Sequence, residues 1–548
     1  GGRRPGLSVR VLVIAALPAA VLPPLFTRLY DGAVLDLIRE GEKLKGRLES
    51  QDEAAGELRA RVESVDEGLE AVISVVGTWR ETEGREVREL YIGRKLQADD
   101  STPWLRIEKL IGVLPGLLCP RSEGRSFHVG LGSGVSAAWG AAAAPKRKVS
   151  CAEIVPGVAA RLGEFRPHNS VAEYEVLLGD GRSLLAADPG GFELIVTDIV
   201  FPEDAGAGGL FSEDYFRLAR EKLSPDGVFA HWLPLWQMPP DAFRSVVRAF
   251  LNAFPEATMW AASLNGDRPL VMLLGTAGKA APVLDPAGLA GRVAAAKLDG
   301  AQLASVNMAS AEAILSHFVA GPEKLAELAG SAQASSDDQP FSELSAARGD
   351  VQPETPLTNL KLLVGNWQLV AGCAAVGSEA WDEKLRGRVA DLEASRLLLA
   401  EACVTMYAEL PRVSNFVLDK LNQARKASPG DPEISYELWS ALTLRADACA
   451  LRGDRRGLDE ARGLCEDALE VAPDRRRDYI LRRLAVSLSV AGERQRALKL
   501  AVEARDADPR EPINWEVLSQ VAYAAGEKKL GDEARERAAD LRSRGGQR

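Results

Sequence analysis

The sequence predicts an α/β chain with a small β unit, a doubly wound sheet of mainly parallel strands, and an all-α array of helical repeats. Three observations support this prediction. A glycine-rich turn from Gly130 to Gly134 follows a short apolar stretch. Strand-like and helix-like stretches then alternate, which is typical of a parallel sheet covered by helices on both faces. From about Val389 onward, the chain is helical and repeats a pattern of small residues.

The length and composition indicate several globular domains. The chain has 548 residues, which corresponds to roughly two to four cores of ordinary size. Apolar residues make up 46% and charged residues 26%, so extensive disorder is not expected. We expect an apolar segment at 1–30, a charged helical connector at 31–68, a small β unit at 69–120, a doubly wound sheet domain at 121–280, a mostly helical extension at 281–385 and helical repeats at 386–548.

The charge and the cysteine usage exclude some classes of function. The net charge of −11 argues against nucleic acid as a partner, because binding phosphates requires a basic surface. Six cysteines occur without CxxC pairs, and there are only four histidines, so neither a zinc site nor a disulfide framework is expected. We therefore expect no metal and a reducing compartment.

The N-terminal stretch from Val11 to Thr27 is uncharged over 17 residues and follows three arginines, at Arg3, Arg4 and Arg10. Three interpretations stay open: the end of a transmembrane helix, a signal-type apolar region, and a buried segment. The first of these predicts a cytoplasmic catalytic region that this segment anchors to the inner membrane.

The segment before the main sheet is predicted to contain a helix and two strands. From Asp31 to about Glu70 the chain is rich in charged residues, leucine and alanine and has no proline, which favours a charged helical connector. The β-like runs Leu69 to Val76 and Val87 to Ile92 then predict a small antiparallel unit.

The predicted main sheet is built from short apolar runs separated by helical patterns. The strand-like runs are Ser126 to Val129, Lys148 to Ala152, Tyr174 to Leu178, Phe192 to Thr197 and Val228 to Trp232. The helical patterns are Ser212 to Lys222 and Asp241 to Phe254. An Asn-Gly signal within Leu264 to Asp267 predicts an antiparallel hairpin between Ala257 to Ala262 and Pro269 to Leu274.

The glycine turn and the acidic residues after it predict a nucleoside site in a Rossmann-like domain. Glu153 ends the next strand about 20 residues after the turn, the spacing at which an acidic side chain accepts hydrogen bonds from ribose hydroxyls. Asp180 follows the third strand and would accept from an adenine amino group. Asp198 ends the fourth strand, where a carboxylate can deprotonate an attacking amine or hold a cationic group. A helix cap is the alternative role for Asp198.

The C-terminal region carries a repeat. Gly492 and Gly526 are 34 residues apart, which is the length of a tetratricopeptide repeat. Small residues and prolines fall at the matching positions of three successive segments, although the intervals between the prolines require insertions. Plain amphipathic helices in a bundle are the alternative. The positions that carry the pattern are Ala424, Pro429, Ala461, Ala468, Pro473, Leu484, Ala485, Leu488, Ala497, Ala504 and Pro509.

Several motifs in order resemble the spermidine synthase family. The similarity extends from about residue 70 to about residue 350 and is closest to the long bacterial forms, whose synthase domain follows a membrane segment. The motifs are Gln97, GLGSG at Gly130 to Gly134, AEIVP at Ala152 to Pro156, GDGRSLL at Gly179 to Leu185, FELIVTD at Phe192 to Asp198, GLFSEDYF at Gly209 to Phe216, LSPDGVFAHWLPL at Leu223 to Leu235 and the acidic stretch Ser336 to Glu343.

This resemblance implies a methyltransferase-type fold and aminopropyl transfer from decarboxylated S-adenosylmethionine to a polyamine acceptor. Asp198 would be the general base. No permanent cofactor is implied, because decarboxylated S-adenosylmethionine or S-adenosylmethionine is a co-substrate. The helical repeats would bind a protein partner. The residues implied to bind the nucleoside are Gln97, Gly130, Gly132, Ser133, Gly134, Glu153, Asp180 and Gly181.

The sequence departs from the family pattern at the acids that hold the diamine. Ser133 stands where the family's turn usually has an aspartate, and Phe201 stands where the family has a second acid. There is also no clear Tyr-x-Glu element after Gln97. Two alternatives therefore stay open: a methyltransferase that uses intact S-adenosylmethionine, and a catalytically silent scaffold that binds partners through its repeats.

Other polar residues near the predicted cleft have two interpretations each. His231 could act in catalysis or pack in the core, and Trp236 and Gln237 could line an acceptor pocket. Asp337, Asp338 and Glu343 could bind a cation, although a loop cap or an ion pair is the more common role of such residues.

Overall fold

The computed structural model describes residues 60–545, apart from gaps at 68–71, 81, 84, 94, 199–200, 203, 205, 279–283, 348–350, 374–375, 379–380, 411, 451, 453 and 472–476. The segment from Val11 to Thr27 lies outside the described residues, and so does Pro473 of the repeat pattern. The chain divides into two compact units. One consists of Gly1–Arg80 and Arg85–Asp100, and the other of Glu81–Gly84 and Ser101–Arg548.

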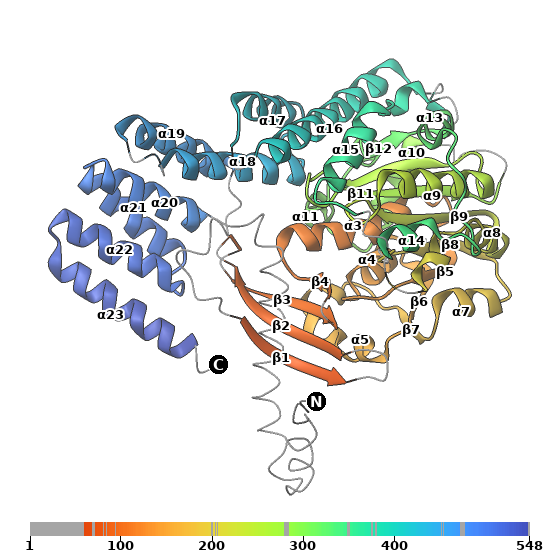
Figure 1. The fold of residues 1–548 in the computed structure, drawn as a ribbon, viewed down its shortest axis with the longest axis horizontal. Coiled ribbons are helices and arrows are strands. Elements are labelled where there is room, and N and C mark those ends of the chain that lie inside the picture. Colours follow the sequence, from red (N-terminus) through yellow and green to blue (C-terminus); the bar gives the residue numbers. More distant parts are fainter. Residues whose placement is uncertain are drawn as a thin grey trace, which may run out of the picture. The chain divides into compact units, whose positions relative to one another are not determined.

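The N-terminal unit is an antiparallel sheet with the strand order β1-β2-β3-β4 (Figure 1). Two of its strands were predicted, but the helical connector is wrong over Ala60–Glu67, which is strand β1. This strand forms one edge of the sheet, and an edge strand tolerates charged residues on its outer side, so its composition resembles that of a solvated helix. The strands are β1 (Ala60–Glu67), β2 (Val72–Arg80), β3 (Arg85–Ile92) and β4 (Lys95–Asp99).

The second unit contains an eight-stranded sheet with the order β12-β10-β11-β9-β8-β5-β6-β7 (Figure 1). The five strands β9, β8, β5, β6 and β7 are parallel, and β10, β11 and β12 add an antiparallel edge. The predicted hairpin and the predicted fold class are confirmed. The strands are β5 (Glu123–Val129), β6 (Lys146–Glu153), β7 (Glu175–Leu178), β8 (Phe192–Thr197), β9 (Leu223–Pro234), β10 (Thr258–Ser263), β11 (Leu270–Thr276) and β12 (Phe318–Ala320).

Helices cover both faces of this sheet because successive apolar side chains of the central strands point in opposite directions. Leu194 and Val196 pack with helices α3, α4 and α10, whereas Ile195 packs with α7, α8 and α9. This arrangement is the doubly wound sheet that the alternating pattern predicts. The covering helices are α3 (Thr102–Leu118), α4 (Val135–Ala143), α7 (Gly181–Ala187), α8 (Glu213–Lys222), α9 (Pro240–Ala253) and α10 (Pro286–Ala295).

Short helices fill the connections and also form most of the segment after β11. The exception is β12, which has three residues and is therefore too short to show an alternating pattern. The remaining short elements are α5 (Pro156–Ala160), α6 (Arg166–Asn169), α11 (Gly300–Ala304), α12 (Ala311–Leu315), α13 (Pro322–Ala329), α14 (Phe341–Ala347), α15 (Thr355–Gly365) and the 3-10 turns η1 (Leu162–Phe165), η2 (Ala207–Phe211) and η3 (Val370–Gly372).

The C-terminal region is all-helical, as predicted, and consecutive helices lie side by side (Figure 1). Gly492 and Gly526 both adopt the left-handed conformation, with φ of 85° and 87°, in the turn after α20 and at the end of α22. The apolar core of these helices is continuous with one face of the main sheet. The helices are α16 (Glu383–Glu409), α17 (Asn415–Ala427), α18 (Pro432–Ala450), α19 (Arg455–Val471), α20 (Arg477–Val490), α21 (Arg494–Ala507), α22 (Pro512–Ala525) and α23 (Lys528–Gly545).

Among the helices of the described residues, none combines the length and the apolar character that crossing a membrane requires. The tetratricopeptide type of the repeats and the division into six segments stay predictions.

His231 of β9 belongs to the core. Its side chain is fully buried, and its ring lies edge-on to Phe211 and Phe216, with a centroid distance of 5.1 Å to each. Burial lowers the pKa of His231 to about 3, because the charged imidazolium would lose its hydration. The imidazole is therefore neutral in the folded protein at neutral pH, which agrees with the packing role and not with the catalytic role.

The buried imidazole predicts a pH-dependent loss of stability. In the unfolded chain His231 binds a proton near pH 6.5, whereas in the folded chain it binds one only near pH 3. The free energy of unfolding is therefore unaffected by protonation of this residue above pH 6.5 and decreases as the pH falls toward 3. When the pH falls from 7.5 to 5, the free energy of unfolding should decrease by about 2 kcal/mol more in the wild type than in His231→Phe. Denaturant unfolding at both pH values measures this difference, and equal losses in the two proteins would contradict it.

Candidate functional site

The predicted acidic residues follow strands that end at one edge of the main sheet. Backbone hydrogen bonds link these ends: the Gly130 amide donates to Ala152, the Gly179 amide to Glu153, and the Asp198 amide to Val129, at 2.8–3.0 Å. Strands β6 and β7 lie on one side of β5, and β8 and β9 lie on the other, so the order of the strands reverses at β5. Ligands of open α/β sheets bind at such a switch point, outside the carboxyl ends of the strands.

The glycine turn after β5 has a backbone that other residues would strain. Gly130, Gly132 and Gly134 all have positive φ, between 52° and 97°. At Gly134, a β-carbon would lie 2.2 Å from the hydroxyl oxygen of Tyr174. At Gly130, it would lie 3.3 Å from the β-carbon of Asp198. The turn therefore depends on glycine for both its conformation and its close contacts.

Glu153 ends β6 and supports this turn. Its carboxylate accepts hydrogen bonds from the backbone amides of Leu131, at 3.3 Å, and Val155, at 2.7 Å. The residue is only 7% exposed. Burial raises the pKa of Glu153, although the amides of Val155 and Leu131 oppose this effect. The amides of Ile154 and Gly132 act on this carboxylate in the same direction, so Glu153 is held by the backbone of the turn and of the segment that follows β6.

Two apolar side chains beside Glu153 are exposed, and neither is among the residues that the sequence predicts for the site. Ile154 is 55% exposed and Leu178 is 56% exposed. They lie at neighbouring strand ends, because Leu178 pairs with Glu153 in the parallel register of β6 and β7. An exposed apolar pair at the carboxyl edge could stack against the flat face of a base. An apolar residue directly after a strand-ending acid was the available signal.

Asp180 and Gly181 lie in the turn after β7. Asp180 is the N-cap residue of α7, and its carboxylate accepts from the Ser183 amide at 2.7 Å. The Asp180 side chain is exposed at the edge of the sheet. Gly181 is buried, and a β-carbon there would lie 2.6 Å from a methyl group of Val129. Gly181 therefore allows α7 to approach β5, which is a packing role.

Two serines beside the glycine turn each hold a carboxylate from another element. The Ser133 hydroxyl donates to Glu108 of α3 at 2.7 Å, and the Ser136 hydroxyl donates to Asp198. Glu108 is 7% exposed, and its other oxygen accepts from the indole of Trp104 at 3.1 Å. No local pattern in the sequence indicates Glu108, because it precedes the turn by a whole helix and strand.

The other candidates belong to several different elements. Gln97 belongs to the N-terminal unit, where it lies in β4 at the register shift between Leu96 and Ala98. Phe201 is 7% exposed, so an apolar ring occupies the place of the second acid. The Trp236 ring lies edge-on to Trp104 at 6.2 Å, which brings the loop after β9 close to α3.

The acidic segment before α14 forms ion pairs and caps. The Asp337 carboxylate binds both terminal nitrogens of Arg182, at 2.8 and 2.6 Å, and accepts from the Ser212 hydroxyl. Its hydrogen bond with Arg182 lowers the pKa of Asp337. Glu343 accepts from the Gly208 amide at 3.1 Å. In the described part of the chain, no group of acidic, histidine or cysteine side chains is arranged to hold a metal ion.

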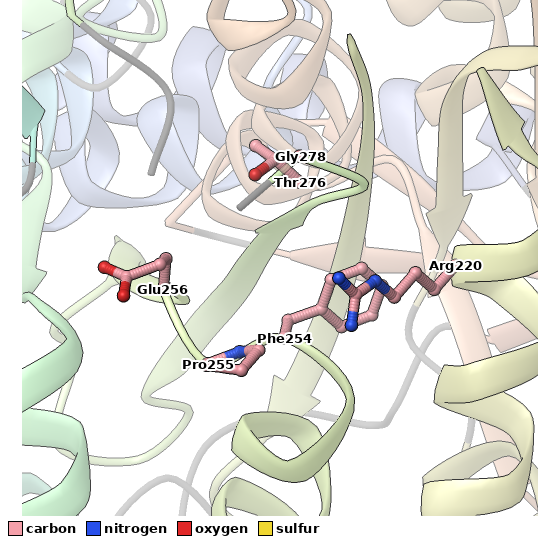
Figure 2. Close-up of a pocket in the computed structure, with 6 residues that line it drawn as sticks. All are labelled: Arg220, Phe254, Pro255, Glu256, Thr276 and Gly278. Carbon is pink, nitrogen blue, oxygen red and sulfur yellow. The ribbon is translucent and has the colours of Figure 1, made fainter. Parts of the chain in front are cut away.

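A pocket of about 110 Å³ lies beside α8 and the ends of β10 and β11, and Figure 2 shows its lining residues. It lies at the amino ends of the parallel strands, opposite to the candidate site. It is lined by Arg220, Phe254 and Thr276, among others. Thr276 pairs with Val228 near the amino end of the parallel strands. This pocket is therefore separate from the candidate site.

Comparisons with known proteins find similarity in fold only. No protein-family model matches the chain, and no curated protein matches it. Similar solved structures include a spermidine synthase in complex with the transition-state analogue AdoDATO, which is 15% identical with a TM-score of 0.39 over 49% of this chain and 88% of that one. The spermidine synthase from Thermotoga maritima is 14% identical, with a TM-score of 0.37 over 49% and 87% of the two chains. Human methyltransferase-like protein 13 in complex with SAH is 18% identical, with a TM-score of 0.25 over 31% and 78%. Similarity at this level carries no inference about activity.

Proposed function

We propose that the chain is a spermidine synthase-like transferase that moves an aminopropyl group from decarboxylated S-adenosylmethionine to an amine acceptor. The observation that carries the proposal is Glu153, a buried carboxylate that holds the glycine turn at the switch point of a parallel sheet. In this proposal Glu153 binds the ribose hydroxyls, and Ile154 and Leu178 contact the adenine. The remaining polar contact to the adenine amino group comes from Asp180.

Asp198 would carry the chemical step. The acceptor nitrogen attacks the aminopropyl carbon next to the sulfonium, the bond between this carbon and sulfur breaks, and its electron pair stays on sulfur to form methylthioadenosine. Asp198 takes the proton that the acceptor nitrogen loses. The hydrogen bond from Ser136 orients the Asp198 carboxylate for this role.

A methyltransferase that uses intact S-adenosylmethionine is the second candidate. The buried ring of Phe201 and the hydroxyl of Ser133 favour it, because both stand where acids would hold a cationic acceptor. Identification of the nucleoside product distinguishes the two reactions. Methylthioadenosine would support aminopropyl transfer, and S-adenosylhomocysteine would support methyl transfer.

For the C-terminal helices, we propose a tetratricopeptide-type array that binds a protein partner. The left-handed glycines at Gly492 and Gly526, one repeat length apart, support this assignment. Paired helices that contact their neighbours in order also support it.

Glu153→Gln is expected to weaken nucleoside binding, because the amide removes the charge that strengthens hydrogen bonds from ribose hydroxyls. A change of about 10- to 100-fold in the Kd of methylthioadenosine corresponds to the loss of one charged hydrogen bond. Calorimetry measures it. Glu175→Gln is the matched control, because Glu175 starts the neighbouring strand at the opposite edge and is exposed. Equal affinities of Glu153→Gln and the wild type would exclude the ribose role.

Asp198→Asn is expected to reduce turnover by about 10²- to 10⁴-fold, the usual contribution of a general base, while methylthioadenosine still binds. The assay follows nucleoside product formation with a panel of amines. Asp226→Asn, at an exposed position near the start of β9, serves as the control and should retain wild-type turnover. Unchanged turnover in Asp198→Asn would show that another group accepts the proton.

A further inference from the structure

Helix α3 is interlocked with α4, the helix that begins at the glycine turn. A β-carbon at Gly112 of α3 would lie 2.0 Å from the backbone oxygen of Ser136 and 2.6 Å from the backbone nitrogen of Gly140. The two backbones therefore touch without intervening side chains. Because Ser136 also holds Asp198, a displacement of α3 would displace both the start of α4 and this carboxylate.

The same helix contacts the glycine turn directly. Glu108 lies two positions after Arg106 and accepts the hydrogen bond of Ser133. Trp232 of β9 donates its indole N–H to the backbone oxygen of Ile111, at 3.2 Å, which attaches α3 to the sheet as well. A hydrogen bond and backbone packing thus connect α3 to the glycine turn, so that the turn would move if α3 moved.

At its N-terminal end, α3 is held by the C-terminal helical region. The Arg106 guanidinium lies 3.0 Å from the carboxylate of Glu433 in α18 and donates to the backbone oxygen of Ala262, at 3.1 Å. Glu433 also accepts from the Leu264 amide at 2.8 Å. Its second oxygen lies 3.2 Å from Arg396 of α16.

The charged groups of Arg106, Glu433 and Arg396 are buried, and a buried charge is costly unless its partners stay in place. The Glu433 and Arg396 side chains are each 1% exposed, and Arg106 is 12% exposed. Burial acts to raise the pKa of Glu433, but Arg106 and Arg396 attract its charge and hold the pKa below the ordinary value. The carboxylate therefore stays ionised and needs both arginines in place.

We infer that Glu433 is a positioning residue of the nucleoside site: through Arg106 it fixes α3, and α3 fixes the glycine turn and the Ser136–Asp198 pair. The helical region then supports the site structurally, in addition to any partner that it binds. The binding readout of this inference rests on the proposed function, whereas its structural readout does not.

The experiment compares Glu433→Gln with Glu437→Gln in the full chain at pH 8. Glu437 is a matched control because it lies one turn further along α18, is equally buried, and accepts a hydrogen bond from Asn265 of the hairpin, while Arg106 acts on it only through charge attraction. Amide hydrogen exchange of the peptide that covers residues 130–136 is measured without ligand, and the Kd of methylthioadenosine is measured by calorimetry.

We expect Glu433→Gln to accelerate exchange in this peptide and to raise the Kd, each by about 10-fold, a typical coupling between linked sites. Glu437→Gln should leave both nearly unchanged. Equal effects of the two variants, or no effect of Glu433→Gln, would overturn the inference. If Glu433→Gln does not fold, Arg106→Lys replaces it, since it keeps the charge and removes the planar fork. If the wild type binds no nucleoside, the proposed function fails, and the exchange comparison still decides the inference.

Discussion

The candidate site depends on the parallel register of four strands. Backbone hydrogen bonds join Gly130 to Ala152, Gly179 to Glu153, and Asp198 to Val129, so the loops after β5, β6, β7 and β8 leave the sheet at one edge. Each of these loops carries a polar residue or a glycine that the site uses. A slip of the register by one residue would turn the strand-ending side chains to the other face and separate the acids from the turn. The backbone hydrogen bonds therefore create the site, and the side chains give it its chemistry.

Packing then makes the glycine turn rigid. Gly112 and Gly140 let α3 and α4 touch through their backbones, and Ser133 and Ser136 attach carboxylates from two other elements to the start of α4. The apolar core that lies under one face of the sheet continues into the C-terminal helices. Backbone packing and these hydrogen bonds thus restrain a turn whose glycines could otherwise sample many conformations.

The distribution of charge at the edge bears on the choice of substrate. The carboxylates of Glu108, Glu153 and Asp198 are all engaged by hydrogen-bond donors of the protein, and an aromatic ring, Phe201, is buried where a second acid would hold a dication. Recognition of a diamine with two ammonium groups needs an opposite charge at each end. This arrangement of charge supports the proposed nucleoside donor more than a proposed acceptor with two positive charges.

The sequence by itself determined the elements whose information is local. Runs such as Phe192–Thr197 have the apolar composition of buried strands, and a glycine turn followed by Glu153, Asp180 and Asp198 has a spacing typical of the carboxyl ends of a parallel sheet. Strand β1 was mistaken for part of a helix and β12 was missed, because an edge strand tolerates charge and three residues show no period. Only the tertiary structure decided that Glu108 reaches Ser133, that His231 is buried among aromatic rings, and that Glu433 holds Arg106. These contacts join residues that are distant in the chain, and their geometry arises when helices and strands pack, so no pattern of neighbouring residues encodes it.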